Sequence, residues 1–215
     1  MTRRRSSRSG FTLYEVVIVV GLLGLVMAAA GLVSSSTSNL ARFSGEKSRT
    51  ESKAHRTLDR VVTELTTVAR ALMTPDPLVP AWTSTLDFQC ANGVAAGLAT
   101  FGPLTRLVLE YEPGELDDGV DNDGDGLVDE GRLVLVRNQG GPGQQRVVLC
   151  TGVAEYAEGE TGALGDQNGN GLDDERGFHL RRVGDLMVVS LTLQEMVEEG
   201  QVLTLTSSTS FRLRN

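Results

Sequence analysis

Residues 10–33 read GFTLYEVVIVVGLLGLVMAAAGLV, and this stretch decides how the rest of the chain is organised. Its last 18 residues, Val16 to Val33, contain no charged and no hydrogen-bonding side chain. As an α-helix this run spans about 27 Å, close to the hydrocarbon thickness of a bilayer. Four arginines precede it within the first ten residues. The positive-inside rule therefore predicts a cytoplasmic N-terminus, with Ser34 and the residues after it outside the cytoplasm.

A carboxylate, Glu15, stands directly before the apolar run. An ionised glutamate at this depth costs roughly 3 kcal/mol, so we expect it to have a partner. Cleavage after Gly10 would create one, because the new α-amino group of Phe11 is a cation four residues away. The alternative is an interfacial carboxylate that reaches up to the lipid headgroups.

A basic leader that ends in Gly10, followed by Phe11-Thr-Leu-Tyr-Glu15 and an apolar helix, resembles the class III signal of type IV pilins and type II secretion pseudopilins. The resemblance implies that a prepilin peptidase cuts between Gly10 and Phe11 and methylates the new N-terminus. It also implies that Glu15 helps to register each subunit against the N-terminus of a neighbour. The implied partners are the peptidase, other pilins or pseudopilins, and the inner membrane. An ordinary signal peptide would have a shorter apolar core and be cut after it.

A second helical pattern follows a polar stretch and Gly45, which offers a bend. Apolar residues recur at three- and four-residue spacings: Leu58, Val61, Val62, Leu65, Val68, Ala69 and Leu72. This pattern predicts an amphipathic helix that Pro75 and Pro77 end. We therefore expect a leader at 1–10, a transmembrane helix at 11–33, its periplasmic continuation at 34–74, and a globular head at 75–215.

Beyond the prolines, short runs rich in Val, Leu and Thr predict β-strands. These runs are Leu107–Tyr111, Leu133–Arg137, Arg146–Thr151, Leu186–Leu193 and Val202–Arg214. The last two, joined across Val197 to Gln201, are typical of a terminal hairpin. The sequence thus predicts an α+β, pilin-like fold, in which a long N-terminal helix packs on an antiparallel β-sheet head.

Two acidic loops share one phase, with oxygen-bearing side chains at positions 1, 3, 5 and 9 and glycine at position 6. Calcium takes six to eight oxygen ligands, and this alternation around a turn supplies them, with a backbone carbonyl at position 7. Position 10 adds a glutamate that can complete the shell. The candidate ligands are Asp121, Asp123, Asp125, Leu127, Asp129 and Glu130 in the first loop, and Asp166, Asn168, Asn170, Leu172, Asp174 and Glu175 in the second.

Both loops depart from a complete EF-hand, because position 12 is Arg132 in the first and Gly177 in the second, where a bidentate glutamate belongs. We therefore expect calcium-binding turns between strands, with the more acidic first loop binding more tightly. Solvated Asx-rich turns without an ion are the alternative.

The net charge is −8, and it becomes −12 once the four arginines of residues 1–10 are removed. This balance argues against nucleic-acid binding, which needs a basic face. The two cysteines, Cys90 and Cys150, lie in the part expected outside the cytoplasm, which favours a disulfide between them. Two buried, unpaired thiols are the alternative.

Neither the two histidines nor the spacing of serines and aspartates indicates a catalytic site, and the sequence predicts no enzyme. We expect a minor pilin or pseudopilin of a type IV pilus tip or type II secretion pseudopilus. Chain length and the C-terminal hairpin resemble J-type minor pseudopilins and W-type minor pilins. A calcium-dependent adhesin or receptor on an uncleaved anchor is the alternative, and a periplasmic hydrolase on such an anchor is a third.

Overall fold

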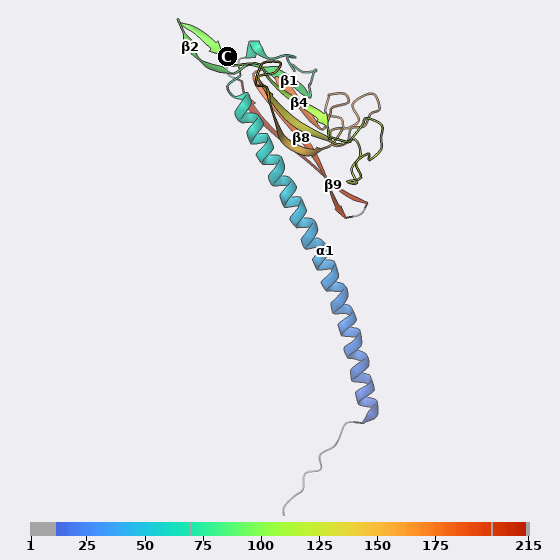
Figure 1. Cartoon of the computed structure of the whole chain (residues 1–215). Helices are drawn as coiled ribbons and strands as arrows, with labels where there is room; N and C mark the ends of the chain where they lie inside the picture. Colours follow the sequence, from blue (N-terminus) through green and yellow to red (C-terminus); the bar gives the residue numbers. More distant parts are fainter. Residues whose placement is uncertain (1–11, 69, 199, 214–215) are drawn as a thin grey trace, which may run out of the picture. The chain divides into compact units, whose positions relative to one another are not determined.

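The computed structural model describes residues 12–68, 70–198 and 200–213, with only the backbone described at 35–39 and 198. The chain divides into two compact units, residues 1–45 and 46–215, and α1 passes from the first into the second. Figure 1 labels the elements. Their bounds are α1 Leu13–Leu65, η1 Arg70–Leu72, β1 Thr85–Phe88, β2 Ala91–Ala95, β3 Leu98–Phe101, β4 Thr105–Tyr111, β5 Gly131–Arg137, β6 Gln145–Val153, β7 Phe178–Val183, β8 Leu186–Glu198 and β9 Gln201–Arg212.

The helix α1 continues through Gly45, where the sequence offered a bend, and ends at Leu65, well before Pro75. Two features explain this end. The hydroxyls of Thr66 and Thr67 donate to carbonyls of the last turn, and such side-chain bonds compete with the helical ladder. The backbone of Val68 then forms a β-bridge with Cys90.

The second unit is built on a seven-stranded sheet in the order β1-β4-β5-β6-β8-β7, in which all the strand pairs are antiparallel. Strand β8 is its long central element. One edge of β8 pairs with β9 along most of its length, and the other edge pairs with β7 and then with the end of β6, through Val153 and Leu193. The α+β, pilin-like fold is therefore confirmed.

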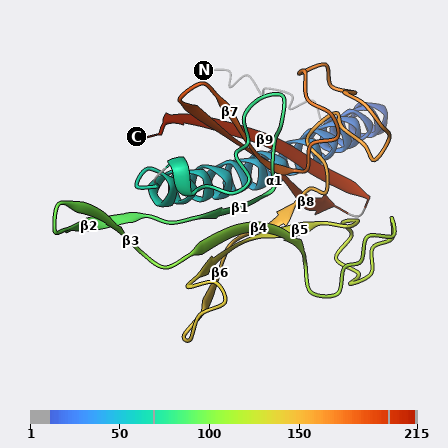
Figure 2. The same ribbon diagram turned by 90° about the horizontal axis from the view of Figure 1, so that it is seen from above.

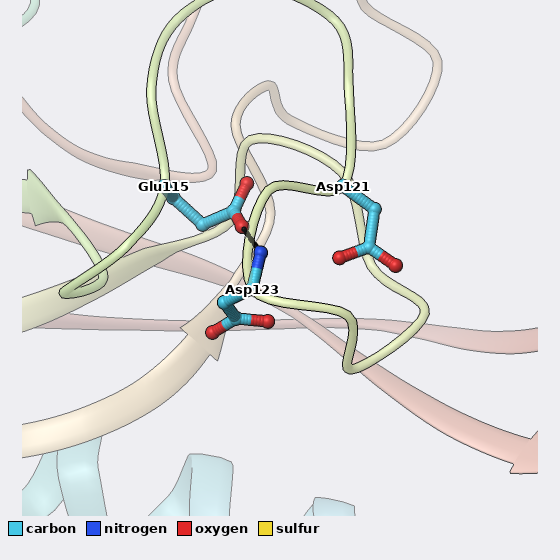
Figure 3. A group of neighbouring side chains, drawn as sticks. All are labelled: Glu115, Asp121 and Asp123. Carbon is cyan, nitrogen blue, oxygen red and sulfur yellow. Dashed lines mark hydrogen bonds between the residues drawn. The ribbon is translucent and has the colours of Figure 1, made fainter.

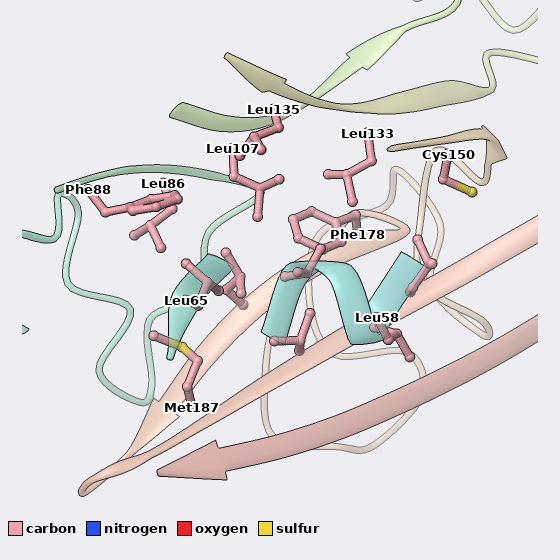
Figure 4. Packing of buried hydrophobic residues seen from close by; sticks show 14 of the residues in the cluster. Leu58, Leu65, Leu86, Phe88, Leu107, Leu133, Leu135, Cys150, Phe178 and Met187 are labelled. Atoms are coloured by element: carbon pink, nitrogen blue, oxygen red, sulfur yellow. The ribbon is translucent and has the colours of Figure 1, made fainter. Parts of the chain in front are cut away.

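The core lies between the second half of α1 and the concave side of this sheet. Figure 2 shows β7 and β9 on one side of the helix and β1, β4 and β5 on the other. The helix buries Ala54, Leu58, Val61 and Leu65, whose spacing forms one stripe. Figure 4 shows Leu58 and Leu65 facing side chains of the sheet, with Phe178 fully buried beside them. Of the predicted stripe, Val62 and Leu72 are only half-buried.

Five predicted strands are confirmed as β4, β5, β6, β8 and β9, and the last two form the predicted hairpin. The sequence did not predict β1, β2, β3 or β7. Strands β2 and β3 form a separate two-stranded sheet whose residues are almost all exposed. The two acidic loops occupy equivalent places, between β4 and β5 and between β6 and β7.

Candidate functional site

The start of α1 is capped by a reciprocal pair of residues, Thr12 and Glu15. The backbone N–H and hydroxyl of Thr12 donate to Glu15 Oε2 at 2.8 and 3.0 Å, and the N–H of Glu15 donates back to Thr12 Oγ1 at 3.3 Å. This arrangement is a capping box, which satisfies N–H groups left open at a helix start. Gly10 and Phe11 lie outside the described residues.

The first 22 residues of α1, Leu13–Ser34, have a mean hydropathy of 2.8 and are long and apolar enough to cross a membrane. None of the residues in this span is buried within the chain. Among them are large side chains such as Leu22, Leu25 and Leu32, each more than half exposed. A surface of this size and composition needs lipid or other apolar helices around it.

The two acidic loops are parts of a longer repeat. We name Tyr111–Glu130 module 1 and Tyr156–Glu175 module 2. The two segments match at a constant offset of 45 residues, in the pattern Tyr, two residues, Gly-Glu, five residues, Asp, and then the shared loop ending in Asp-Glu. The repeat therefore begins ten residues before the first predicted ligand of each loop.

The backbones of the modules carry the same hydrogen bonds. Each module is closed at its base by an N–H that donates to the carbonyl of the final glutamate: Glu112 to Glu130 at 3.1 Å, and Ala157 to Glu175 at 2.8 Å. Each also has an aspartate in the left-handed region just before that glutamate, Asp129 with φ 52° and Asp174 with φ 53°. The repeat in sequence is therefore a repeat in structure.

The first aspartate of each loop holds the turn closed. Asp121 accepts the N–H groups of Gly124 and Gly126 at 2.6 and 2.9 Å. In module 2, Asp166 accepts the equivalent pair from Gly169 and Gly171 at 2.5 and 2.8 Å. The same holds further along, where the N–H of Leu127 donates to Asp125 and that of Leu172 to Asn170, both at 2.9 Å. The side chains of Leu127 and Leu172 are buried.

Sequence reasoning missed a glutamate at the front of each module, Glu115 and Glu160, both buried. Glu115 accepts the N–H groups of Asn122 and Asp123 through Oε1, both at 2.9 Å, and that of Asp129 through Oε2 at 3.2 Å. Figure 3 shows the Glu115 carboxylate directed into the loop beside Asp121 and Asp123. Glu160 accepts the N–H of Asn168 at 3.0 Å in the same way. The 45-residue repeat was the signal that would have found both.

Module 1 brings together two overlapping sets of carboxylates. Oxygens of Glu115, Asp121 and Asp123 lie within 4.8 Å of one another, and so do oxygens of Asp123, Asp125 and Glu130. The position-9 residue, Asp129, lies elsewhere: it accepts the N–H groups of Asp118 and Gly119 and is grouped with Asp117 and Glu155. The structure thus gathers Asp121, Asp123, Asp125 and Glu130 and separates Asp129 from them.

Glu130 has an unusual environment. Its side chain has no exposed surface, and neither oxygen accepts a hydrogen bond from another residue that the structure describes. Burial raises the pKa of Glu130 to about 7, and the carboxylates of Asp125, Glu115 and Asp123 add to the rise, against its own backbone amide. A buried carboxylate without a compensating partner is costly, so this side chain calls for a positive group.

In module 2 the buried final glutamate has a hydrogen-bond partner. Its final glutamate, Glu175, is also fully buried, but Asn170 Nδ2 donates to Glu175 Oε1. The equivalent of Asn170 in module 1 is Asp125, a carboxylate, which cannot donate when it is ionised. One oxygen each of Glu160, Asp174 and Glu175 nevertheless stays without a hydrogen-bond partner within the described chain.

The two modules meet at Arg176, which directly follows module 2. Its guanidinium lies 5.3 Å from the ring centroid of Tyr111 and 5.5 Å from that of Tyr156, the first residues of the two modules. Arg176 also donates to the Tyr111 hydroxyl at 2.8 Å and lies 3.7 Å from a carboxylate oxygen of Glu155. One cation thus links the bases of both modules.

Both cysteines are free thiols in the structure, so the disulfide predicted between Cys90 and Cys150 is not present. Cys90 lies 3.6 Å from the carbonyl of Glu64. Burial raises the pKa of the Cys150 thiol, and its neighbours on α1 include Thr57. Thr57 and Glu64 are seven residues apart, about 10 Å along the helix, whereas a disulfide needs Cα atoms within about 7 Å.

Comparison with protein families finds a match at the N-terminal end of the chain. Residues 5–31 match the family model described as the prokaryotic N-terminal methylation motif. No curated protein matches the chain. No solved structure matches it either. The matched segment covers part of the arginine-rich leader, residues 10–15 and most of the apolar run.

Proposed function

Because the chain carries the class III prepilin signal of the type IV pilin and pseudopilin superfamily, we propose that it is a minor pilin or pseudopilin subunit. In this proposal a prepilin peptidase removes residues 1–10 at the Gly10–Phe11 bond, and the inner membrane stores the mature protein. The subunit then joins a type II secretion pseudopilus or a type IV pilus tip. The observation that carries the proposal is the methylation motif leading directly into the apolar part of α1.

The exposed apolar half of α1 supports assembly as well as storage. A span with no buried residue, from Leu13 to Ser34, can be covered by lipid before assembly and by the helices of other subunits afterwards. Both environments remove apolar surface from water, so transfer between them requires no refolding of the helix. This property suits a structural subunit that moves from a membrane into a filament.

In this proposal Glu15 has one partner before assembly and another in the filament. Before assembly it caps its own helix through Thr12. In the filament it would pair with the methylated α-amino group of a neighbouring Phe11, which supplies the positive charge that a buried carboxylate needs. Capping needs only a hydrogen-bond acceptor, whereas pairing needs a negative charge.

The narrower assignment, a J-type pseudopilin or W-type minor pilin, rests on chain length and on the β8–β9 hairpin. That hairpin pairs Leu186–Glu198 with Gln201–Arg212 and forms one edge of the head. A subunit placed at a filament tip would offer such an edge without a neighbour above it. We include this assignment in the proposal on those grounds.

The test compares Glu15→Gln with Glu15→Val in the native host, with filaments sheared from cells and the subunit quantified in them. Glutamine still accepts a hydrogen bond at this place in a capping box, so Glu15→Gln keeps the cap and loses the charge. We expect both variants to insert into the membrane, and both to be depleted from filaments relative to wild type.

The two variants also distinguish helix capping from charge pairing as the function of Glu15. Wild-type incorporation of Glu15→Gln, with loss only in Glu15→Val, would mean that capping and not charge is the function of Glu15. Wild-type incorporation of both variants, or absence of the wild-type protein from every filament fraction, would contradict the proposed function.

A further inference from the structure

The carboxylate of Glu130 is completely buried and accepts no hydrogen bond from any other residue that the structure describes. Protonation would resolve this only in part, since the neutral acid could donate its O–H to a neighbouring carboxylate but would keep a carbonyl oxygen without a donor. The neighbours that the side chain meets are themselves carboxylates, Asp123 and Asp125. Among the residues that the structure describes, the surroundings of Glu130 thus bring carboxylate acceptors together without a positive charge beside them.

The spacing of these oxygens fits one cation. A calcium ion binds oxygen at about 2.3–2.6 Å, so two ligands of the same ion lie at most about 5 Å apart. Oxygens of Asp123, Asp125 and Glu130 lie within 4.8 Å of one another, and Asp123 also belongs to a second such group with Asp121 and Glu115. Glu115 supports this arrangement, because its carboxylate accepts the backbone N–H of Asp123.

The donor set identifies the class of ion. Every member of the two groups offers a carboxylate oxygen, with no histidine or cysteine among them. Hard oxygen donors favour calcium or magnesium over zinc and copper, which take nitrogen and sulfur readily. A turn that supplies ligands from closely spaced aspartates and one buried glutamate suits the irregular, larger shell of calcium, whereas magnesium demands a compact octahedron and retains its water.

Module 2 offers a natural comparison within the same chain. It has the same backbone, but asparagines replace aspartates at 168 and 170, and the amide of Asn170 already donates to Glu175. An ion entering module 2 must displace this bond and meets two fewer negative ligands. The internal repeat therefore predicts two sites of the same geometry and unequal affinity.

We propose that module 1 is a calcium site with Asp121, Asp123, Asp125 and Glu130 as its side-chain ligands. Glu115 is the residue that positions this loop. Module 2 is a weaker copy of the site, in which the Asn170 amide takes the place of the ion at Glu175. Two ligand positions differ between the modules, and of these the fifth loop position, Asp125 in module 1 and Asn170 in module 2, is the one whose side chain in module 2 donates to the final glutamate.

The experiment exchanges this residue between the modules. The full chain is purified in detergent micelles, stripped with chelator, and titrated with calcium chloride by isothermal titration calorimetry. We expect two events for the wild type. Asp125→Asn should weaken the tighter event by about tenfold or more, since it removes a charged ligand and allows an amide bond to Glu130. Asn170→Asp should tighten the weaker event, and magnesium should bind much more weakly at both.

Three further variants test which module gives each binding event, and one of them is a control. Glu130→Gln should abolish the tighter event, and Glu175→Gln should affect only the weaker one. Glu158→Gln changes an exposed carboxylate of module 2 and should leave both events unchanged. Circular dichroism without calcium checks folding, and Glu130→Gln should fold as well as wild type because it removes an unbalanced buried charge.

Three outcomes would overturn the proposal. Wild-type protein that binds no calcium at millimolar concentration would leave the modules as acidic turns. A Glu130→Gln variant that is folded and keeps the tighter event would place the ion elsewhere. Loss of the tighter event in Glu175→Gln instead of Glu130→Gln would reverse the order of the two modules.

Discussion

Trp82, the single tryptophan of the chain, donates a hydrogen bond of 2.8 Å from Nε1 to the backbone carbonyl of Asp173 in module 2. The indole also lies edge-on to the ring of His179, with centroids 6.3 Å apart. Trp82 therefore reports on module 2 and not on module 1.

This contact makes tryptophan fluorescence a local probe of the weaker site. As calcium is added, we expect the emission of Trp82 to change only at the concentration at which module 2 fills. The midpoint should shift to lower calcium in Asn170→Asp and stay in place in Glu158→Gln. An emission change that instead follows the tighter calorimetric event would contradict the separation of the two sites.

Phe178 of β7 belongs to the hydrophobic core and has no exposed surface. Phe178→Ala should lower the free energy of unfolding of the head by about 3–5 kcal/mol, because it removes apolar contacts and leaves a cavity. Chemical denaturation followed by circular dichroism measures this. Val183→Ala, at an exposed position of the same strand, should cost less than about 1 kcal/mol, and an equal loss in both variants would be inconsistent with the described core.

Gly177 has no room for a side chain. A Cβ there would lie 1.9 Å from the backbone carbonyl oxygen of Ala154. We expect Gly177→Ala to push the start of β7 away from Ala154 and to destabilise the head by about 3 kcal/mol, the upper end of the usual cost of overpacking. Gly45→Ala is the matched control, since a Cβ at that helical position meets nothing within 4 Å and should stabilise α1 by up to about 1 kcal/mol. A well-tolerated Gly177→Ala would contradict the close approach.

A pH prediction follows from Asp76, which accepts two hydrogen bonds from the buried guanidinium of Arg182. These bonds lower the pKa of Asp76, and the positive charges of Arg182 and of the nearby Arg70 add to the effect. A carboxylate with a lowered pKa in the folded state contributes stability above its unfolded value, near 4, and that stability is lost as pH falls through the folded value.

The expected result is a loss of stability as pH falls below the ordinary carboxyl range, about pH 4, that is smaller in Asp76→Asn. Because the Asp76 side chain is 48% exposed, we expect the difference to be only about 1 kcal/mol. Urea denaturation at a series of pH values, in the presence of chelator, measures it. Identical pH profiles for variant and wild type would show that the ion pair adds nothing to folding.

The sequence predicted the parts of the fold that depend on local patterns. The apolar run at Val16–Val33 is visible from its length and the stripe at Leu58–Leu65 from its helical periodicity. Strands β2 and β3 were missed because their residues are uncharged and almost all exposed, so no alternation of buried apolar and exposed polar positions marks them. The disulfide prediction failed because compartment and even count say nothing about which part of α1 each cysteine contacts.

The sequence also predicted part of the candidate site, because the ligand spacing of the acidic loops is a local pattern. The spacing of the first loop predicted Asp121, Asp123 and Asp125 as calcium ligands, and Glu130 was a candidate ligand from position 10. Only the structure shows that Glu130 is buried without a hydrogen-bond partner among the described residues, and that Asp129, also buried, accepts the N–H groups of Asp118 and Gly119 instead. Position 12 of the second loop, Gly177, lies just beyond module 2, and the carbonyl of Ala154 occupies the space that a side chain would need there.

The most direct test of the account is the intact mass of the full chain isolated from cells that express a prepilin peptidase. We predict that wild-type protein loses residues 1–10 and gains one methyl group on Phe11, and that Gly10→Ala keeps its leader. A chain that retains residues 1–10, as an uncleaved anchor would, or one that begins near Ser34, as after an ordinary signal peptide, would contradict the account.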